Sequence, residues 1–278
     1  MTSNVDLHIH SVFSDGLHTP AEIVAMSRQI GLRIISITDH DTVDGIAGAL
    51  QAAANTELTV IPGLEISADA GKLEIHILGY LMDHTSPDLS AALARFGQAR
   101  LARGQEMVNK LRAMGLRLSW ERVCELAGEG VVGRPHIALA LQEAGYVRSS
   151  QEAFELYLGR NKSAYVPRLK MTPQEAIALI LNAHGVPVLA HPADIAFTVP
   201  DLAAAGLAGI EVYYPFYSPD TIAFLRQLAQ QHHLICTGGS DFHGLGLLPD
   251  NRLGGVCVPA SCVTALCTRR QHLGARNG

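Results

Sequence analysis

The run Asp6-Leu7-His8-Ile9-His10 places two histidines on a short apolar segment that leads directly into a loop of serine, aspartate and glycine. Side chains alternate along a β-strand, so His8 and His10 are expected to project from the same face. The loop adds the carboxylate of Asp15. Imidazole and carboxylate groups at a strand end suit a divalent metal better than a hydrophobic core. We therefore expect the rest of the chain to bring further metal ligands to this strand.

The composition is that of an ordinary globular protein, with 278 residues of which 48% are hydrophobic and 17% are charged. A net charge of −5 argues against a broad nucleic-acid-binding surface but allows a small basic pocket for one phosphorylated ligand. Five cysteines without CxxC spacing predict neither a disulfide framework nor a zinc knuckle. Because there is no signal-like segment or long apolar run, we expect a soluble, cytoplasmic protein without membrane association. The sequence identifies no protein partner.

Short apolar runs alternate with helical segments in two stretches of the chain, as is typical of an α/β fold. Two helix starts, at Thr19 and Thr172, have the form of a capping box with proline next and glutamate three residues after the threonine. Expected strands cover 5–10, 33–38, 58–62, 63–67, 72–80, 186–190, 209–213 and 234–237. Polar clusters follow at least six of these strands, which favours a TIM-like barrel with a parallel sheet over a doubly wound sheet with one switch point.

Residues 86–165 interrupt this pattern with helical periodicity alone, over 87–114, 120–126, 135–144 and 151–158. About 80 residues is too long for an ordinary connecting loop. We therefore predict an inserted all-helical subdomain at 86–165, and a barrel carrying the metal site formed by 1–85 and 166–278. The segment after Gly255 has weak signals and receives no assignment.

Nine polar side chains at expected strand ends form the candidate metal site: His8, His10, Asp15, His40, Glu65, His76, His191, Asp241 and His243. Mixed imidazole and carboxylate ligands suit Mn²⁺, Zn²⁺ or Fe²⁺, whereas oxygen ligands alone would suit Mg²⁺ or Ca²⁺. Nine ligands are too many for one ion and about right for three. The remaining histidines are expected at helix ends or on the surface: His18, His84, His184, His232, His233 and His272.

Six motifs between residues 6 and 244 follow one another in the order found in the PHP (polymerase and histidinol phosphatase) family, which this sequence resembles. They are DLHIHSVFSDG at 6–16, ITDHDT at 37–42, GLEIS at 63–67, EIHILGY at 74–80, AHP at 190–192 and GGSDFHG at 238–244. The insertion, with GRPH at 133–136 and NKSAYVP at 161–167, resembles the group of 3′,5′-nucleotide bisphosphate phosphatases and 5′-phosphate-dependent exoribonucleases. Histidinol phosphatases of the family generally lack this insertion.

The resemblance implies a distorted (β/α)₇ TIM-like barrel with up to three divalent metals, for which Mn²⁺ is the leading candidate and Zn²⁺ or Fe²⁺ the alternatives. Carried over by position, it divides the ligands into three sets: His8, His10, Glu65 and Asp241; Glu65, His76 and His191; and Asp15, His40 and His243.

The sequence offers no protein nucleophile, since it has neither GxSxG nor a P-loop. Two ions about 3.5–4 Å apart can hold one hydroxide between them, so we expect attack on phosphorus by a metal-bridging hydroxide. His243 or Asp39 could stabilise the leaving alkoxide. Asp39 has the alternative role of orienting a ligand imidazole.

Four residues of the insertion are candidates for binding a second phosphate. Arg134 and His136 lie at an expected helix start, where guanidinium, imidazole and backbone N–H groups suit an anion. Arg160 and Lys162 add positive charge in a Gly/Asn turn. The alternative for each is a solvated surface residue.

We predict a metal-dependent phosphatase that removes the 3′-phosphate of a 3′,5′-bisphosphorylated nucleotide, such as adenosine 3′,5′-bisphosphate, and leaves a nucleoside 5′-monophosphate. The main alternative is a 5′→3′ exonuclease on short 5′-phosphorylated oligoribonucleotides. A histidinol-phosphatase-like phosphomonoesterase and C–N bond hydrolysis, as in amidohydrolases, are further alternatives. A non-catalytic metal or nucleotide sensor is disfavoured because no expected ligand is missing.

Overall fold

The computed structural model describes residues 4–71, 73–128, 132–167, 171–244 and 251–274. The chain divides into two compact units. The first joins Met1–Ala91 to Lys170–Gly278, and the second is Ala92–Leu169. The insertion predicted at 86–165 overlaps the second unit.

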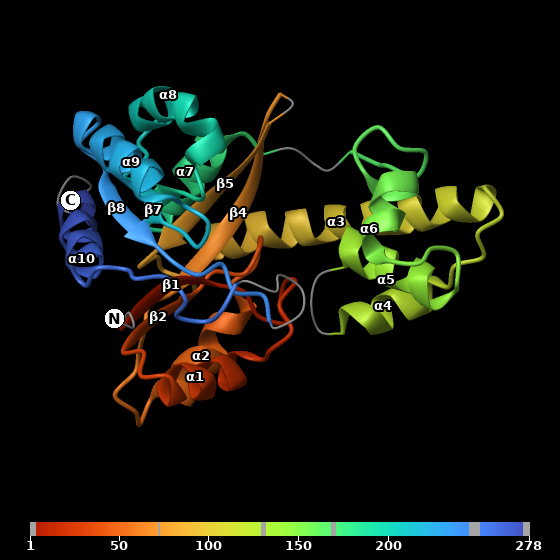
Figure 1. The fold of residues 1–278 in the computed structure, drawn as a ribbon, viewed down its shortest axis with the longest axis horizontal. Coiled ribbons are helices and arrows are strands. Elements are labelled where there is room, and N and C mark those ends of the chain that lie inside the picture. Colours follow the sequence, from red (N-terminus) through yellow and green to blue (C-terminus); the bar gives the residue numbers. More distant parts are fainter. Residues whose placement is uncertain (1–3, 72, 129–131, 168–170, 245–250, 275–278) are drawn as a thin grey trace. The chain divides into compact units, whose positions relative to one another are not determined.

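The strands of the first unit form two sheets (Figure 1). The first sheet is parallel, with neighbouring strands β1 (Val5–Ile9), β2 (Ile34–Ile37) and β3 (Thr59–Val60). The second contains, in order, β4 (Gly63–Ala70), β5 (Leu73–Tyr80), β6 (Val186–Leu189), β7 (Gly209–Tyr213) and β8 (Ile235–Gly238). The predicted strands are therefore present, although residue 72, the expected start of β5, lies outside the described residues.

The expectation of a wholly parallel sheet is wrong around β5, which pairs antiparallel with both β4 and β6. Only two residues connect β4 to β5, and such a short connection allows only an antiparallel pair. Isolated bridges join Ile9 to Phe242 and His40 to Glu65, so each sheet meets the other at single pairs. In the part of the chain that the structure describes there is no continuous closed barrel. The fold is mixed α/β, and the TIM-like barrel is not confirmed.

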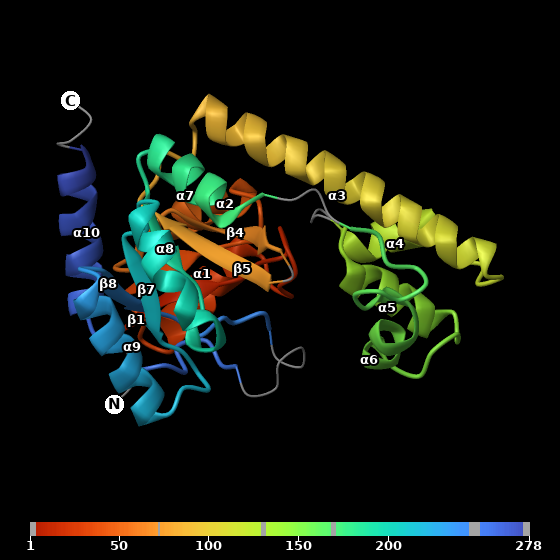
Figure 2. The same ribbon diagram turned by 90° about the horizontal axis from the view of Figure 1, so that it is seen from above.

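Helices cover the sheets of the first unit, and α9 and α10 lie beside β7 and β8 (Figure 2). Both capping boxes are confirmed: the hydroxyl of Thr19 accepts from the Glu22 N–H, and Thr172 and Glu175 repeat the arrangement. The helices are α1 (Pro20–Gln29), α2 (Asp44–Ala53), α7 (Pro173–Asn182), η2 (Ala193–Thr198), α8 (Val199–Ala204), α9 (Pro219–Gln231) and α10 (Ser261–Gly274). Of these, η2, α8 and α10 were not predicted from the sequence. In α10 only Cys262 and Leu266 are buried, too few for a clear apolar stripe.

Strand β1 is buried on both faces, and the two faces differ in chemistry. Val5 and Leu7 pack in one apolar cluster and Ile9 in another. The opposite face carries polar side chains beginning with Asp6 and His8. This alternation is what directs the histidines of the opening run into the interior.

Helices are the only regular elements among the described residues of the second unit. Its elements are the continuation of α3 (Pro87–Ala113), then α4 (Trp120–Ala127), α5 (Arg134–Glu143), α6 (Ser150–Ala153) and the π-helical turn η1 (Phe154–Leu158). Fully buried Val108, Leu111, Ile137 and Leu141 belong to one apolar core. The helix predicted over 151–158 is thus a short α-helix followed by a π-helical turn.

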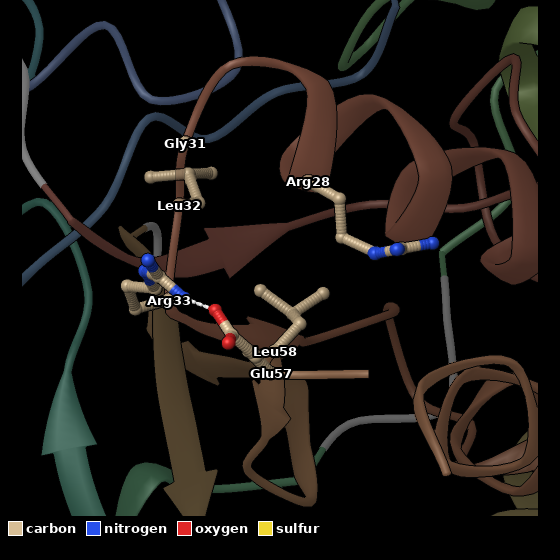
Figure 3. Close-up of a pocket in the computed structure, with 6 residues that line it drawn as sticks. All are labelled: Arg28, Gly31, Leu32, Arg33, Glu57 and Leu58. Carbon is tan, nitrogen blue, oxygen red and sulfur yellow. Dashed lines mark hydrogen bonds and ion pairs between the residues drawn. The ribbon is translucent and has the colours of Figure 1, made fainter. Parts of the chain in front are cut away.

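A pocket of about 300 Å³ lies before strands β2 and β3, where Arg33 forms an ion pair with Glu57 (Figure 3). Its lining residues precede β2 and β3, whereas the candidate ligand His40 follows β2. The pocket therefore lies at the opposite end of β2 from His40. Among the described residues, no helix is both long enough and apolar enough to cross a bilayer. All five cysteines carry free thiols.

Candidate metal centre

The two histidines of the opening run lie side by side in the interior. His8 is 0% exposed and His10 is 1% exposed, and their Nε2 atoms are 3.1 Å apart. Because side chains along β1 point alternately to its two faces, both rings project from the polar face, as predicted. Two imidazole nitrogens this close suit ligands of a common cation.

Glu65 on β4 is the centre of the site. Its Oε2 lies 3.2 Å from Nε2 of both His8 and His10, and 3.2 Å from Nδ1 of His40. Its Oε1 lies 3.0 Å from Nδ1 of His76 and 3.4 Å from Nε2 of His191. One carboxylate thus contacts five imidazoles. Burial acts to raise the pKa of Glu65, but the imidazoles around it hold that pKa well below its usual range.

The segment after β8 completes the cluster, because the bridge from Ile9 to Phe242 places it against β1. Oδ1 of Asp241 lies 3.1 Å from Nε2 of His10. Nε2 of His243 lies 3.3 Å from Oδ1 of Asp15, and the His243 ring stacks on His10 with centroids 4.1 Å apart. The structure therefore brings together all nine residues that the sequence analysis selected.

The donor atoms fall into three overlapping groups that differ from the implied ligand sets. The groups are His10, Asp15, His40 and His243; His8, His10 and Glu65; and His40, Glu65 and His76. His10 and His40 each belong to two groups, whereas the resemblance assigned each to one metal. The central role of Glu65 is common to both divisions.

Among the described residues, three buried atoms of the site lie within about 3.2 Å of a polar neighbour but make no hydrogen bond of suitable geometry, which tests whether the residues fit a metal. They are Oε1 of Glu65 and the Nδ1 atoms of His40 and His76. A buried polar atom without a partner costs about 1–3 kcal/mol, so such atoms are rarely left unsatisfied. Bound divalent cations would satisfy all three. The site therefore fits metal ions, and its donor set suits Mn²⁺, Zn²⁺ and Fe²⁺ alike.

The pKa values of the imidazoles indicate how the negative charge of the buried carboxylates is neutralised. Burial acts to lower the pKa of His10 and of His76, but the carboxylates beside them raise it to about 10. For His40, burial dominates and lowers the pKa to about 4. Protons on some imidazoles thus offset the buried carboxylate charge, a task that metal cations would take over.

Glu211, a 0% exposed carboxylate on β7, belongs to the site but was not predicted from the sequence. Its Oε1 lies 3.0 Å from Nδ1 of His8, and its Oε2 accepts from the His191 N–H at 2.8 Å. A carboxylate on the second ring nitrogen of a ligand histidine fixes its tautomer and orientation. The available signal was a single charged residue inside the buried-type strand GIEVY.

Asp39 holds the loop that carries Asp15. Its carboxylate accepts from the Ser11 N–H and hydroxyl, both at 2.6 Å, and from the Ser14 hydroxyl at 2.7 Å. Burial raises the pKa of Asp39. Since both oxygens are engaged by the loop, the geometry favours a positioning role over stabilisation of an alkoxide.

Two candidate ligands have strained backbones. His191 has φ 30° and Asp241 has φ 51°, a region that L-residues rarely adopt. Asp241 is held there by Tyr214, whose hydroxyl donates to its Oδ2 at 2.8 Å, and by Asn251, which donates to its carbonyl at 3.1 Å. Such strain persists where surrounding contacts enforce it, and it concentrates at functional sites.

The four candidate phosphate-binding residues lie in the second unit. The Arg134 guanidinium lies 5.6 Å from the centre of the Phe154 ring, and Nδ1 of His136 accepts from the Gly133 N–H at the start of α5. Arg160 and Lys162 are exposed. The structure thus places Arg134 and His136 together at one helix start, as predicted.

A mixed α/β fold with a buried cluster of imidazoles and carboxylates defines a candidate metal-binding protein. A family model described as PHP domain matches residues 6–179. A 3′,5′-nucleoside bisphosphate phosphatase of Chromobacterium violaceum is 33% identical over 254 residues, covering 88% of each chain. A 5′–3′ exoribonuclease of Salmonella typhimurium is 35% identical over 252 residues, which are 86% of this chain and 84% of that relative.

Among solved structures, a protein described as a metal-dependent phosphoesterase of Bifidobacterium adolescentis matches with a TM-score of 0.85. It is 32% identical, and the match covers 95% of this chain and 96% of the other. The chain belongs to the PHP family. It is a metal-dependent phosphoric ester hydrolase.

Proposed function

We propose that this hydrolase removes the 3′-phosphate of 3′,5′-bisphosphorylated nucleotides and releases nucleoside 5′-monophosphates. The observation that carries the proposal is the cluster around Glu65, whose donors reach enough positions for more than one cation. The Chromobacterium violaceum relative, named for this class of substrate, supports it over nearly the whole chain. The substrate would be a small phosphorylated nucleotide.

The reaction splits the bond between phosphorus and the ribose 3′ oxygen, with water supplying hydroxide to phosphorus and a proton to the alkoxide. Divalent cations, with Mn²⁺ proposed, would lower the pKa of water and neutralise phosphoryl oxygens. His8, His10, Glu65 and Asp241 would hold one cation. Glu65 with His76 and His191 would hold a second, and Asp15, His40 and His243 a third.

The hydrogen bonds around these ligands serve to orient them. Nδ1 of His243 donates to the Asp241 carbonyl at 2.9 Å, so its Nε2 faces Asp15. With Nε2 directed at Asp15, His243 would act as a ligand, and its help to the leaving alkoxide would come through the cation that it holds. Glu211 and Asp39 orient ligands and touch no substrate.

The substrate's second phosphate is assigned to Arg134 and His136, with Arg160 and Lys162 adding positive charge. Guanidinium and helix-start N–H groups bind phosphate well, and Phe154 beneath Arg134 limits the freedom of its side chain.

The finer fold proposal is a distorted barrel formed by the two sheets. The isolated bridges support it, because they link the end of β1 to the segment after β8 and the segment after β2 to β4. Followed from β1 through the second sheet and back to β2, neighbouring strands would then form a closed ring, joined at these two places by single residue pairs.

The test is phosphate release from adenosine 3′,5′-bisphosphate by the Mn²⁺-loaded protein, with the nucleoside product identified by chromatography. We expect adenosine 5′-monophosphate and phosphate in equal amounts. Histidinol phosphate serves as the comparison substrate. Turnover of histidinol phosphate without turnover of the bisphosphate would contradict the proposal.

A second candidate function is 5′→3′ exonuclease activity on short 5′-phosphorylated RNA, which the Salmonella typhimurium relative supports at similar identity. A length series of 5′-phosphorylated oligoribonucleotides separates the two. If kcat/KM rises with length beyond the mononucleotide, the exonuclease is the main activity. If it is highest for the bisphosphate, the phosphatase is.

A further inference from the structure

A pocket of about 460 Å³ opens beside His191 in the first unit. Three aromatic residues of the segment after β7 line it, namely Tyr214, Phe216 and Tyr217. Asp194 and Thr221 contribute the remaining polar side chains. Because His191 also contacts Glu65, the pocket adjoins the cluster of candidate metal ligands.

The two tyrosines are anchored, whereas the phenylalanine is not. Tyr214 donates its hydroxyl to Asp241, and the Tyr217 hydroxyl accepts from the Ala193 N–H at 3.0 Å. Phe216 contacts Tyr214 edge-on at 6.1 Å between ring centres and is 60% exposed. Covering a large, solvent-exposed apolar ring with a second planar ring is favourable, because it removes apolar surface from water and stacks the two rings.

The charge of the lining decides which part of a substrate the pocket suits. Among the described residues that line it there is no lysine or arginine, and the one carboxylate, that of Asp194, is exposed. A phosphate would be repelled there. A neutral planar heterocycle stacks on aromatic rings in a sequence-tolerant way, and its amino groups suit a carboxylate acceptor.

We propose that this pocket binds the nucleobase of the substrate, with Phe216 as the stacking surface. The inference rests on the proposed nucleotide phosphatase, in which the base is joined through its ribose to the phosphate at the metal centre. It adds a specificity site in the first unit, distinct from the phosphate-binding residues proposed in the second.

The experiment compares adenosine 3′,5′-bisphosphate with methyl ribofuranoside 3,5-bisphosphate, which carries both phosphates but no base. The variants are Phe216→Ala, Phe216→Tyr and the control Phe224→Ala, whose phenylalanine is 53% exposed on α9 outside the pocket. Phe216→Ala is expected to lower the kcat/KM preference for the nucleotide over the base-free analogue by about 5- to 20-fold. Phe216→Tyr and Phe224→Ala should keep the preference within about twofold of the unchanged protein.

A binding arm separates this inference from the proposed reaction. Calorimetry measures the Kd of adenosine 5′-monophosphate and of methyl ribofuranoside 5-phosphate for the same proteins, without turnover. A loss of nucleotide affinity limited to Phe216→Ala supports the base pocket even if the bisphosphate is not hydrolysed. Equal effects on nucleotide and base-free ligands, or no effect on either, overturn the pocket even if the bisphosphate is a good substrate.

Discussion

The two units place their charged side chains in opposite environments. In the first, His8, His10 and Glu65 are at most 1% exposed and face one another. In the second, the buried cluster is apolar, and charges such as Arg122 pair with Glu125 and Glu143 at the surface. Buried charges are costly and surface pairs contribute little, so the first arrangement needs a functional reason and the second does not.

This difference agrees with the proposed division, in which the chemistry and the base pocket belong to the first unit and the second phosphate is bound by the second. Substitutions in the buried cluster should abolish metal binding and turnover. Substitutions in the helical unit should change substrate affinity alone. The following variants test that division in order of expected effect.

The largest effect is expected for Glu65→Gln, which keeps the size of the side chain but removes the charge shared by five imidazoles. Bound metal and phosphate release should both fall by well over about 100-fold, more than is typical for residues outside the ligand set. Metal content is measured by mass spectrometry and activity by phosphate release. Glu57→Gln, which changes an exposed carboxylate of the same unit, is the matched control. Retained metal with lost activity would contradict a ligand role for Glu65.

A smaller effect is expected for Glu211→Gln. Its amide offers one acceptor where the carboxylate serves both the His8 ring and the His191 N–H. Removing such a partner typically lowers metal affinity by about 10–100-fold. Competition with a chelator gives the Kd, and Glu57→Gln again serves as control. An unchanged Kd would show that Glu211 balances buried charge without orienting the ligands.

The site was largely predictable because its residues are marked by local patterns. Alternation of side chains on β1 places His8 and His10 on one face. His40, His191 and Asp241 follow strands that pair in parallel, and the carboxyl ends of such strands meet at one edge. The capping threonines were equally readable, since Thr19 and Glu22 bind each other across three residues.

What escaped prediction depends on contacts between distant segments. Glu211 is 203 residues from His8, and nothing inside GIEVY shows that its carboxylate meets an imidazole. The antiparallel pairing of β5 with β6 joins strands separated by the whole second unit. The exposure of the Phe216 ring likewise depends on distant contacts, because the neighbouring Tyr214 packs against His191 and binds Asp241.

The smallest effect is expected in the second unit, for Arg134→Ala. The KM for adenosine 3′,5′-bisphosphate should rise about fivefold with kcat unchanged, because a half-buried guanidinium contributes about 1 kcal/mol to binding a phosphate away from the reacting bond. Arg122→Ala, an arginine of the same unit already paired with Glu143, should leave KM unchanged.

Adenosine 3′-monophosphate, which lacks the second phosphate, sharpens this last prediction. Its KM should be the same for Arg134→Ala and the unchanged protein, since the contact removed is one that this substrate never makes. A KM that rises equally for both substrates would place Arg134 at the reacting phosphate. A fall in kcat would go further, because the helical unit would then take part in the chemistry and the division between the units would no longer hold.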